Sequence, residues 1–257
     1  MKDPVVQNGR LERIRAFVEQ EQQVTVGQVA AHFHLSAATV RRAIGTLADR
    51  GEISRFRGGA LAIPRSPQEL PVLQREQDQR NAKQRIGRAA AALVGDGETI
   101  FLGSGTTTLE VARNLTDQRD LTVLTNSLLV IRELIPSTDI SVIALGGMLR
   151  RSEYSFIGHL VEQALGEMRV TKVIMGIRAI HPELGLMNDY LPETLTDRAI
   201  LHMGGEVVIV ADHTKCDRVA PAFVAPVSAI DALVTDIDAP DGFVAALEGK
   251  HVNVHRV

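Results

Sequence analysis

Residues 25–59 carry the pattern that most restricts how this chain can fold. At the start of the stretch, apolar residues recur at the spacing of one helical face, at Val26, Val29, Ala30 and Phe33. The periodicity stops at His34, and Ser36 can then cap a second helix, because its hydroxyl can accept a hydrogen bond from a free backbone N–H. The inner face of that second helix consists of Val40, Ile44 and Leu47. The stretch therefore predicts two short helices joined by a tight turn.

The outer face of the second helix carries two small residues and two basic ones: Ala38, Gly45, Arg41 and Arg42. Small residues allow a backbone to approach a groove of DNA closely, and arginines can reach phosphates or the edges of guanine bases. Two helices with this turn and this outer face are typical of a helix-turn-helix. The segment therefore indicates a DNA-binding protein.

Elements on both sides of this motif predict a winged helix-turn-helix domain in residues 1–63. An earlier helix has an apolar stripe that can close a small core, made of Leu11, Ile14, Phe17 and Val18. After the motif, residues 53–55 and 60–63 predict two short strands around a tight turn. This hairpin forms the wing, and Arg55 and Arg57 would place it on the DNA backbone.

Composition and charge fit a soluble two-domain chain. Of the 257 residues, 45% are hydrophobic, which is enough for a sizeable core. Residues 1–65 hold ten Lys and Arg against six Asp and Glu, whereas the rest of the chain holds 18 against 25. Two explanations of this distribution stay open. Either residues 1–65 form a basic head that contacts polyanions while the rest of the chain is an acidic body, or the asymmetry arose by chance. With a single cysteine, no apolar run of about 20 residues and no N-terminal signal segment, we expect a cytoplasmic protein with no membrane contact.

After a proline-containing stretch that we interpret as a linker, residues 64–80, residues 81–257 alternate between strands and helices. The predicted strands are Thr99–Leu102, Leu121–Thr125, Ile140–Leu145, Lys172–Gly176, Val207–Ala211, Ala232–Thr235 and Val252–His255. The body is predicted to start with a helix whose apolar stripe is Ile86, Ala89, Ala90 and Leu93. Later predicted helices include Thr107–Leu115, Leu128–Ile135, Glu193–His202 and Phe243–Glu248. Several strands are continuous apolar runs, as expected in a sheet covered on both faces. The fold class is therefore α/β, with a mostly parallel, doubly wound second domain.

Polar or glycine-rich residues follow four of these strands. Open parallel sheets bind ligands beyond the carboxyl ends of their strands, so these residues are candidate ligand contacts. They are Gly103, Ser104, Gly105, Thr106, Thr107 and Thr108; Asn126 and Ser127; Gly146 and Gly147, with Arg150 and Arg151 close behind; and Asp212, His213, Thr214 and Lys215. Bare N–H groups, hydroxyls and a helix N-terminus favour an anion, which predicts a pocket for a small phosphorylated or acidic ligand.

Each of these features also has an ordinary structural explanation. The Gly-Ser-Gly-Thr turn can be a plain turn, and Lys215 can be a solvated surface lysine. The loop matches neither the Walker pattern nor GxGxxG, so a dinucleotide cofactor is not expected. His32 and His34 diverge on a helix, so no metal site is expected, and Cys216 lies in no nucleophile motif.

Head and body together resemble the DeoR family of bacterial transcriptional repressors. The head carries the pattern Val24-Thr25-Val26, Val29-Ala30, Phe33, Leu35-Ser36, Thr39-Val40-Arg41-Arg42, Leu47, Gly51, Arg55 and Gly58-Gly59-Ala60. The body carries Ile86-Gly87, the run from Asp96 to Thr107, Thr125-Asn126-Ser127, Leu145-Gly146-Gly147 and Asp212-His213-Thr214-Lys215. The resemblance covers nearly the whole chain.

The resemblance implies that the body is a sensor related to sugar-phosphate isomerases such as ribose-5-phosphate isomerase. Its effectors would be phosphorylated sugars or related metabolites. By match of position, Gly103–Thr108 would hold the phosphate, and Asn126, Gly147, Asp212 and Lys215 would line the sugar side. Glu193 falls on a helix that carries an acidic pocket residue in similar proteins.

The chain departs from the family pattern at two places. Ala43-Ile44 stands where an Asp-Leu pair often follows the double arginine. Arg178 stands where an aspartate would accept sugar hydroxyls, in Gly176-Ile177-Arg178-Ala179. Two explanations of Arg178 stay open at this point. It can pair with an acidic group of the effector, or with an internal acid such as Asp189 or Glu193.

The leading hypothesis is a ligand-controlled repressor of sugar-metabolism genes, without enzymatic activity and without a metal or cofactor. It would bind a double-stranded DNA operator as a homodimer or homotetramer, through Thr25, Gln28, Ser36, Ala37, Thr39, Arg41, Arg42, Arg55 and Arg57. An alternative is a phosphosugar isomerase with a regulatory head, in which Asp212, Glu193 and Lys215 supply the chemistry. A third possibility is a constitutive DNA-binding protein with a structural body.

Overall fold

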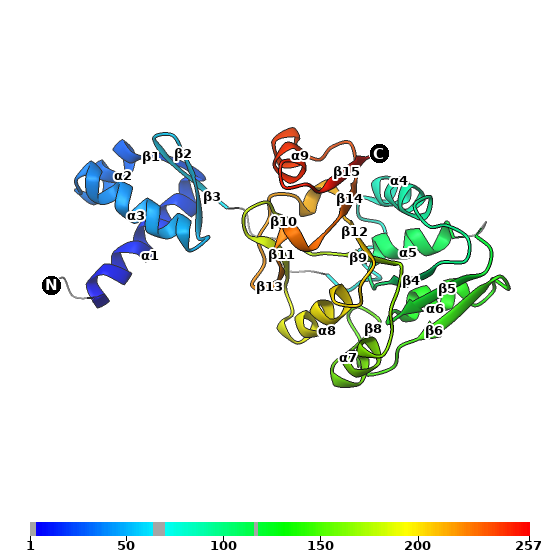
Figure 1. Cartoon of the computed structure of the whole chain (residues 1–257). Helices are drawn as coiled ribbons and strands as arrows, with labels where there is room; N and C mark the ends of the chain where they lie inside the picture. Colours follow the sequence, from blue (N-terminus) through cyan, green and yellow to red (C-terminus); the bar gives the residue numbers. More distant parts are fainter. Residues whose placement is uncertain (1–3, 64–69, 116–117) are drawn as a thin grey trace. The chain divides into compact units, whose positions relative to one another are not determined.

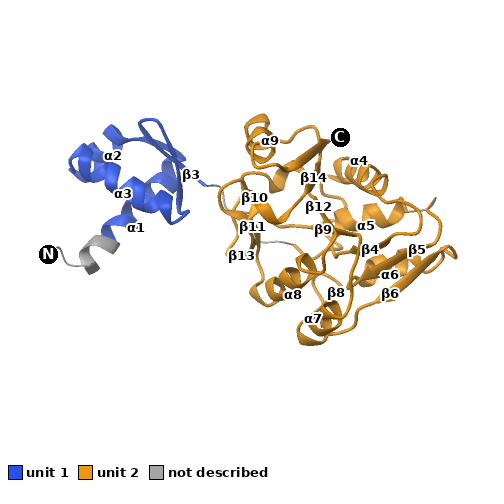
Figure 2. Ribbon diagram, viewed as in Figure 1, with its two compact units in different colours: residues 1–65 blue, residues 66–257 orange. Residues whose placement is uncertain are grey.

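The computed structural model describes residues 4–63, 70–115 and 118–257 (Figure 1). The chain divides into two compact units, Met1–Arg65 and Ser66–Val257 (Figure 2). We expected residues 64–80 to form a linker. Residues 64–69 lie outside the described part, and residues 70–80 belong to the second unit, where the Val72 side chain is fully buried.

The first unit contains three helices and a small antiparallel sheet. The helices are α1 (Pro4–Glu21), α2 (Val26–Phe33) and α3 (Ala37–Asp49). The strands are β1 (Gln23–Thr25), β2 (Ile53–Phe56) and β3 (Gly59–Ala62), in the order β1-β3-β2. The predicted wing is confirmed as the β2–β3 hairpin, whereas β1, which extends it by one strand, was not predicted.

The apolar stripes identified in the sequence form the core of this unit. Its fully or nearly fully buried side chains come from all three helices and the wing, and include Leu11, Ile14, Val18, Val29, Val40, Ile44 and Leu47. The turn between α2 and α3 passes through His34 in the left-handed region, at φ 52°. The two helices therefore meet at a fixed angle through a short, sharply bent connection.

The second unit is built on a seven-stranded parallel sheet. Its strands are β4 (Thr99–Leu102), β5 (Leu121–Thr125), β6 (Ile140–Ala144), β9 (Lys172–Gly176), β12 (Glu206–Val210), β14 (Ala232–Thr235) and β15 (Asn253–Arg256). All seven predicted strands are present, each within one residue at either end. Their order in the sheet is β15-β14-β12-β9-β4-β5-β6, which confirms the predicted parallel, doubly wound architecture.

Helices cover both faces of this sheet. Neighbouring residues of a strand point to opposite faces, so each strand contributes side chains to both cores. Ile100 and Leu102 of β4 pack in one core with helices α4 (Arg80–Ala91), α5 (Thr106–Arg113) and α6 (Leu128–Leu134). Phe101, between them, packs in the other core with α7 (His159–Gly166), α8 (Leu191–Leu201) and α9 (Asp241–Glu248). Of these helices, α7 was not predicted.

Two small antiparallel sheets interrupt the alternation of strands and helices, and neither was predicted. One is the pair β7 (Met148–Arg150) and β8 (Ser155–Ile157). The other contains β10 (Ala179–His181), β11 (Gly185–Asn188) and β13 (Ala222–Ala225). Their strands have only three or four residues, too few for a clear periodicity. They matter because the turns beside them carry Glu153, Arg178 and Asp189.

Candidate functional site

The candidate DNA-binding surface lies on α3 and the wing. Ser36 is the N-cap of α3, as predicted, and its Oγ accepts a hydrogen bond from the Thr39 N–H at 3.2 Å. Arg41 and Arg42 are exposed on the outer face of the helix. Gly45 lies on the same side, where an added Cβ would stand 4.0 Å from Nη1 of Arg55. The small glycine thus allows the wing arginine to approach α3.

The remaining predicted DNA contacts lie around this surface. Thr25 and Gln28 form a capping box at the start of α2: the Thr25 N–H donates to Oε1 of Gln28 at 2.7 Å, and the Gln28 N–H donates to Oγ1 of Thr25 at 3.2 Å. Both side chains are exposed. Ala37 and Arg57 are exposed as well. The structure therefore leaves all the predicted contacts accessible, with Thr39 half-buried.

In the second unit, the strand order creates a switch point between β4 and β9. From β4 the chain continues outward to β5 and β6, then returns to β9 on the other side of β4 and continues to β12, β14 and β15. The loops after β4 and β9 therefore leave the sheet in opposite directions. Such a divergence opens a crevice at the carboxyl ends of the two strands.

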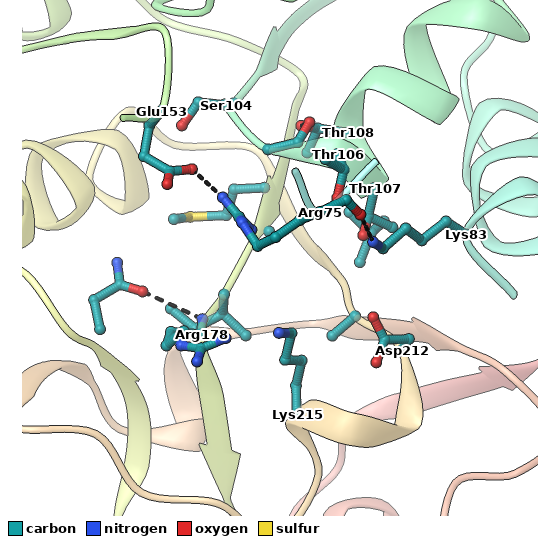
Figure 3. A pocket seen from close by; sticks show the side chains of 18 of the residues that line it. Arg75, Lys83, Ser104, Thr106, Thr107, Thr108, Glu153, Arg178, Asp212 and Lys215 are labelled. Atoms are coloured by element: carbon teal, nitrogen blue, oxygen red, sulfur yellow. Dashed lines mark hydrogen bonds and ion pairs between the residues drawn. The ribbon is translucent and has the colours of Figure 1, made fainter. Parts of the chain in front are cut away.

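A cavity of about 500 Å³ occupies this position (Figure 3). Its walls include residues that follow four strands: Gly103–Thr108 after β4, Asn126 after β5, Ile177 and Arg178 after β9, and Asp212 to Lys215 after β12 without His213. The other walls come from residues 70–83, Glu153, Asn188 and α8. The volume suits a ligand of the size of a small metabolite.

The loop from β4 to α5 is shaped by its glycines. Gly105, the N-cap of α5, has φ +123°, a conformation that L side chains rarely adopt. A Cβ at Gly103 would lie 3.3 Å from Cβ of Met175 on β9, so only glycine fits easily there. The first backbone N–H groups of α5 have no partner within the helix. They come from Thr106, Thr107 and Thr108, which line the cavity and are all nearly buried.

Cationic side chains complete the cavity, and two of them are lysines. Lys83 on α4 is 5% exposed, and its Nζ donates to the Arg75 carbonyl oxygen at 2.8 Å. Burial lowers the pKa of Lys83, and the nearby Asp212 carboxylate opposes that change. Lys215 lies in the short 3₁₀ turn after β12 and is half-buried. The Asp212 carboxylate accepts a hydrogen bond from the Thr214 N–H at 3.0 Å.

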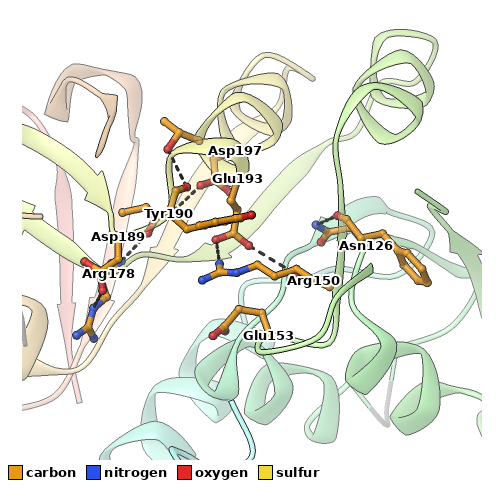
Figure 4. Close-up of polar contacts among 12 residues, drawn as sticks. Asn126, Arg150, Glu153, Arg178, Asp189, Tyr190, Glu193 and Asp197 are labelled. Carbon is orange, nitrogen blue, oxygen red and sulfur yellow. Dashed lines mark hydrogen bonds and ion pairs between the residues drawn. The ribbon is translucent and has the colours of Figure 1, made fainter. Parts of the chain in front are cut away.

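Arg178 takes part in an internal ion pair and also lines the cavity (Figure 4). Its Nε donates to Oδ2 of Asp189 at 2.8 Å, and its backbone N–H donates to Oδ1 of Asn188 at 3.2 Å. The Asn188 amide in turn donates to the Asp197 carboxylate. Burial raises the pKa of Asp197 to about 7, against the effect of that hydrogen bond. One of the two explanations of Arg178, a pair with Asp189, is therefore present in the structure.

A second ion pair lies beside the first. Arg150 on β7 pairs with Glu193 on α8, and the Arg150 guanidinium lies 4.6 Å from the centroid of the Tyr190 ring (Figure 4). The Ser155 hydroxyl donates to Oε1 of Glu193 at 3.5 Å. Glu193 lines the cavity, whereas Arg150 does not. Arg150 therefore reaches the site only through its carboxylate partner.

Twelve of the nineteen candidate effector residues line the cavity, and seven do not. Those that line it are Gly103, Ser104, Gly105, Thr106, Thr107, Thr108, Asn126, Arg178, Glu193, Asp212, Thr214 and Lys215. Those outside the lining are Ser127, Gly146, Gly147, Arg150, Arg151, Asp189 and His213. Ser127 is the N-cap of α6, and its Oγ accepts from the Val130 N–H at 3.3 Å. Asp189 stands behind Arg178 as its ion-pair partner.

Several charged and polar residues of the lining were not predicted: Arg75, Asp78, Gln79, Lys83, Glu153, Asn188 and Asp197. For Lys83 a signal existed, because it lies at the spacing i, i+3, i+7 with the apolar residues Ile86 and Ala90 of α4. A lysine on an apolar stripe is a candidate for a buried functional charge. Arg75, in a proline- and glutamine-containing stretch, had no comparable signal.

One group of possible metal ligands exists among the described residues, which the sequence had not indicated. His213, Asp236 and Asp238 hold ligand atoms within 4.8 Å of one another. The His213 backbone N–H donates to Oδ1 of Asp236 at 2.6 Å, and its Nδ1 lies 2.7 Å from Oδ2. Both Asp236 oxygens are thus used by His213, which gives the group a structural explanation.

In the described ranges, no helix is long and apolar enough to cross a membrane.

Comparisons with known proteins cover both units. A family model of the DeoR-like helix-turn-helix domain matches residues 10–66, and a model of the DeoR C-terminal sensor domain matches residues 78–237. The transcriptional repressor AccR of Agrobacterium fabrum is 32% identical over 228 residues, 88% of each chain. The glycerol-3-phosphate regulon repressor of Escherichia coli is 32% identical over 254 residues, 99% of each chain.

Among solved structures, ribose 5-phosphate isomerase A from Methanocaldococcus jannaschii is similar with a TM-score of 0.40 and 16% identity, over 54% of this chain and 55% of that one. The eIF2B beta chain of Chaetomium thermophilum is similar with a TM-score of 0.44 and 17% identity, over 63% of this chain and 52% of that one. The two family matches and the repressor relatives decide the assignment. This chain belongs to the DeoR family of DNA-binding transcriptional regulators.

Proposed function

We propose that this chain represses genes of carbohydrate metabolism and that a phosphorylated metabolite in the cavity controls its binding to DNA. The observation that carries the ligand assignment is the cavity itself, where the N-terminus of α5 and buried cationic side chains meet at the switch point of the sheet. Helix N-termini and cations both favour phosphate. The glycerol-3-phosphate repressor among the relatives agrees with a phosphorylated effector.

For the ligand, we propose that the phosphate lies against Gly105–Thr108, within reach of Lys83. The N–H groups of the first turn of α5 would donate to its oxygens. Asn126, Asp212 and Lys215 would contact the sugar or polyol part from the ends of neighbouring strands. This arrangement uses the polar groups that already line the cavity, and it requires no cofactor.

For Arg178, we propose that it selects an acidic group on the effector. The guanidinium is 5% exposed and lines the cavity while its Nε is held by Asp189. A guanidinium fork suits a carboxylate or a second phosphate, and Asp189 would fix its direction. Arg178→Ala should therefore weaken the binding of acidic sugar phosphates at least five-fold more than that of neutral ones. Equal losses for both ligand types would remove this role.

For DNA, we propose that α3 enters the major groove with Arg41 and Arg42, while Thr25, Gln28, Ser36, Arg55 and Arg57 contact phosphates and Ala37 and Thr39 lie at the base edges. A single recognition helix reads only a few base pairs, so two or four copies would bind a two-fold symmetric operator. Analytical ultracentrifugation of the full chain tests this directly. A monomer both with and without DNA would contradict it.

An isomerase-like activity is the alternative, and the hydrogen bonds and ion pairs of the cavity carboxylates argue against it. Isomerisation needs a carboxylate base that is available beside the sugar carbons. Glu193 is engaged by Arg150 and Ser155, and Asp212 accepts hydrogen bonds from Thr214. We therefore propose that these groups bind the ligand and do not transfer protons.

The test is a thermal-shift screen of the full chain against inorganic phosphate, glycerol 3-phosphate, and pentose and hexose phosphates, each paired with its unphosphorylated counterpart. A ligand at 100 times its Kd should stabilise the chain by about 2.7 kcal/mol. We expect stabilisation by phosphorylated compounds alone, and a change of DNA affinity by the best of them. Equal stabilisation by the unphosphorylated compounds would contradict the ligand assignment, and turnover of a sugar phosphate would support the isomerase instead.

A further inference from the structure

The segment 70–79 is the first described part of the second unit after the DNA-binding unit, and it is anchored on the cavity wall. Val72 is fully buried in a small apolar cluster with Leu109 of α5 and Leu129 of α6. Its backbone N–H donates to the Ser152 carbonyl oxygen at 2.8 Å. The chain that comes from the DNA-binding unit is therefore fastened to the sensor beside the effector cavity.

Arg75 of this segment extends into the cavity wall. Its guanidinium pairs with Glu153, in the turn between β7 and β8, and its Nε donates to the Leu70 carbonyl oxygen at 2.7 Å. Its own carbonyl oxygen accepts the hydrogen bond from Lys83. In Figure 3 the residue lies between Glu153 and Lys83, joined to each by a dashed line. Arg75, Glu153 and Lys83 all line the cavity.

The chemistry of this pair matches the chemistry of the proposed ligand. A guanidinium binds carboxylate and phosphate with the same fork of donors. The Arg75 and Glu153 side chains are 12% and 8% exposed, so water screens their attraction only weakly. A phosphate bound at the start of α5 would enter the same cavity and offer more charge and more acceptor oxygens than Glu153 does.

We propose that Arg75 is an effector-binding residue, and that Glu153 and the effector's phosphate compete for its guanidinium. This inference rests on the proposed function. When Arg75 turns from Glu153 to the phosphate, the contacts that fasten residues 70–79 to the β7–β8 turn change. The segment that leads from the DNA-binding unit is then held differently in the liganded and ligand-free states. Ligand binding can thus change the affinity for DNA, because the two states differ in a defined contact.

The test measures inorganic phosphate binding to the full chain by calorimetry, with chloride as the control for ionic strength. We expect Arg75→Gln to weaken phosphate binding at least ten-fold and Glu153→Gln to strengthen it at least three-fold. Competition further predicts that Glu153→Gln has no effect in the Arg75→Gln background. If Glu153 acts only through its charge, Glu153→Gln will raise phosphate affinity equally in the wild-type chain and in Arg75→Gln. That result would overturn the proposal.

A matched control separates binding from anchoring. Arg113 on α5 holds the same segment through Glu76, at 2.7 Å, but does not line the cavity. Arg113→Gln should therefore leave phosphate affinity unchanged. Where Arg75→Gln does not fold, Arg75→Lys keeps the charge and loses the fork, and should weaken phosphate binding at least three-fold. Unchanged affinity in the Arg75 variants would overturn the proposal.

Hydrogen exchange then reports on the segment itself. Phosphate should change the exchange of amides in residues 70–79 in the wild-type chain and in Arg113→Gln, but not in Arg75→Gln. A wild-type chain that binds no phosphate would defeat both this inference and the proposed function. Protection confined to Thr106–Leu109, with residues 70–79 unchanged, would defeat this inference alone.

Discussion

The DNA-binding surface and the effector cavity are assembled in different ways. The surface comes from residues 25–57, which are close in the sequence and exposed on one helix, its neighbours and a hairpin. The cavity collects residues from positions 70 to 215, many of them buried and ion-paired. A side chain of the DNA-binding surface can be changed without affecting its neighbours. A change in the cavity leaves the buried partner of the altered side chain without its ion pair or hydrogen bond.

The largest expected effect concerns the surface. The double substitution Arg41→Ala and Arg42→Ala should lower the affinity for operator DNA at least about 100-fold, since each base or phosphate contact contributes about 1–3 kcal/mol. Both side chains are exposed, so thermal stability and phosphate binding should stay as in the wild type. Fluorescence anisotropy with DNA fragments selected by the wild-type chain measures the loss. Arg132→Ala, at an exposed position of α6, is the control, and an equal loss there would break the comparison.

The next effect concerns the backbone of the cavity. Gly105→Ala places a side chain at φ +123°, which should cost about 1–3 kcal/mol of stability and weaken phosphate binding about ten-fold or more. Gly146 was also predicted as an effector residue, but it is exposed and an added Cβ there meets no atom within 4 Å. Gly146→Ala should change neither quantity. Equal phosphate binding by the two variants in calorimetry would show that phosphate does not bind at the start of α5.

Gly105 and Gly146 illustrate how much of the candidate site could be predicted from the sequence. The strand ends were predictable because apolar runs set the strands, and parallel strands end at one edge. The lateral order of the strands was not predictable. β5 is the neighbour of β4, so Asn126 reaches the cavity, but β6 is the outermost strand and its end, with Gly146, lies roughly 10 Å from β4.

The unpredicted residues have a related physical reason. Val40, Ile44 and Leu47 could be placed in a core from local periodicity alone. Arg75 and Glu153 lie 78 positions apart and meet only through the packing of residues 70–79 against the β7–β8 turn. Similarly, nothing local indicates that Arg150 is turned toward Glu193 on α8. Tertiary contacts between short, irregular segments leave no period in the sequence.

A smaller effect concerns the buried carboxyl group of Asp197. Its pKa in the folded chain is about 7, raised by burial from 3.8. Between pH 4 and 7 the folded state therefore keeps a proton that the unfolded state has lost, so stability falls as pH rises through this window. Asp197→Asn should remove this loss, about 2 kcal/mol between pH 5 and 7. Urea unfolding at several pH values measures it, and parallel curves for the two chains would contradict it.

The smallest effect is expected at Cys216. Burial raises the pKa of its thiol to about 12, so very little thiolate exists at neutral pH. The native chain should resist iodoacetamide at pH 8, as followed by intact mass. Cys216→Ala should change DNA and phosphate affinities less than two-fold. Rapid alkylation of the folded chain would show that the core around Cys216 is more open than the structure indicates.

The central claim is that the cavity and the DNA-binding surface are coupled, and one measurement tests it most directly. The affinity for operator DNA is measured with and without the best phosphorylated ligand, and the affinity for that ligand with and without operator DNA. Coupling requires the same factor in both directions, and we expect a factor of at least about five. A ligand that binds with the same affinity to the free chain and to the DNA complex would contradict the account.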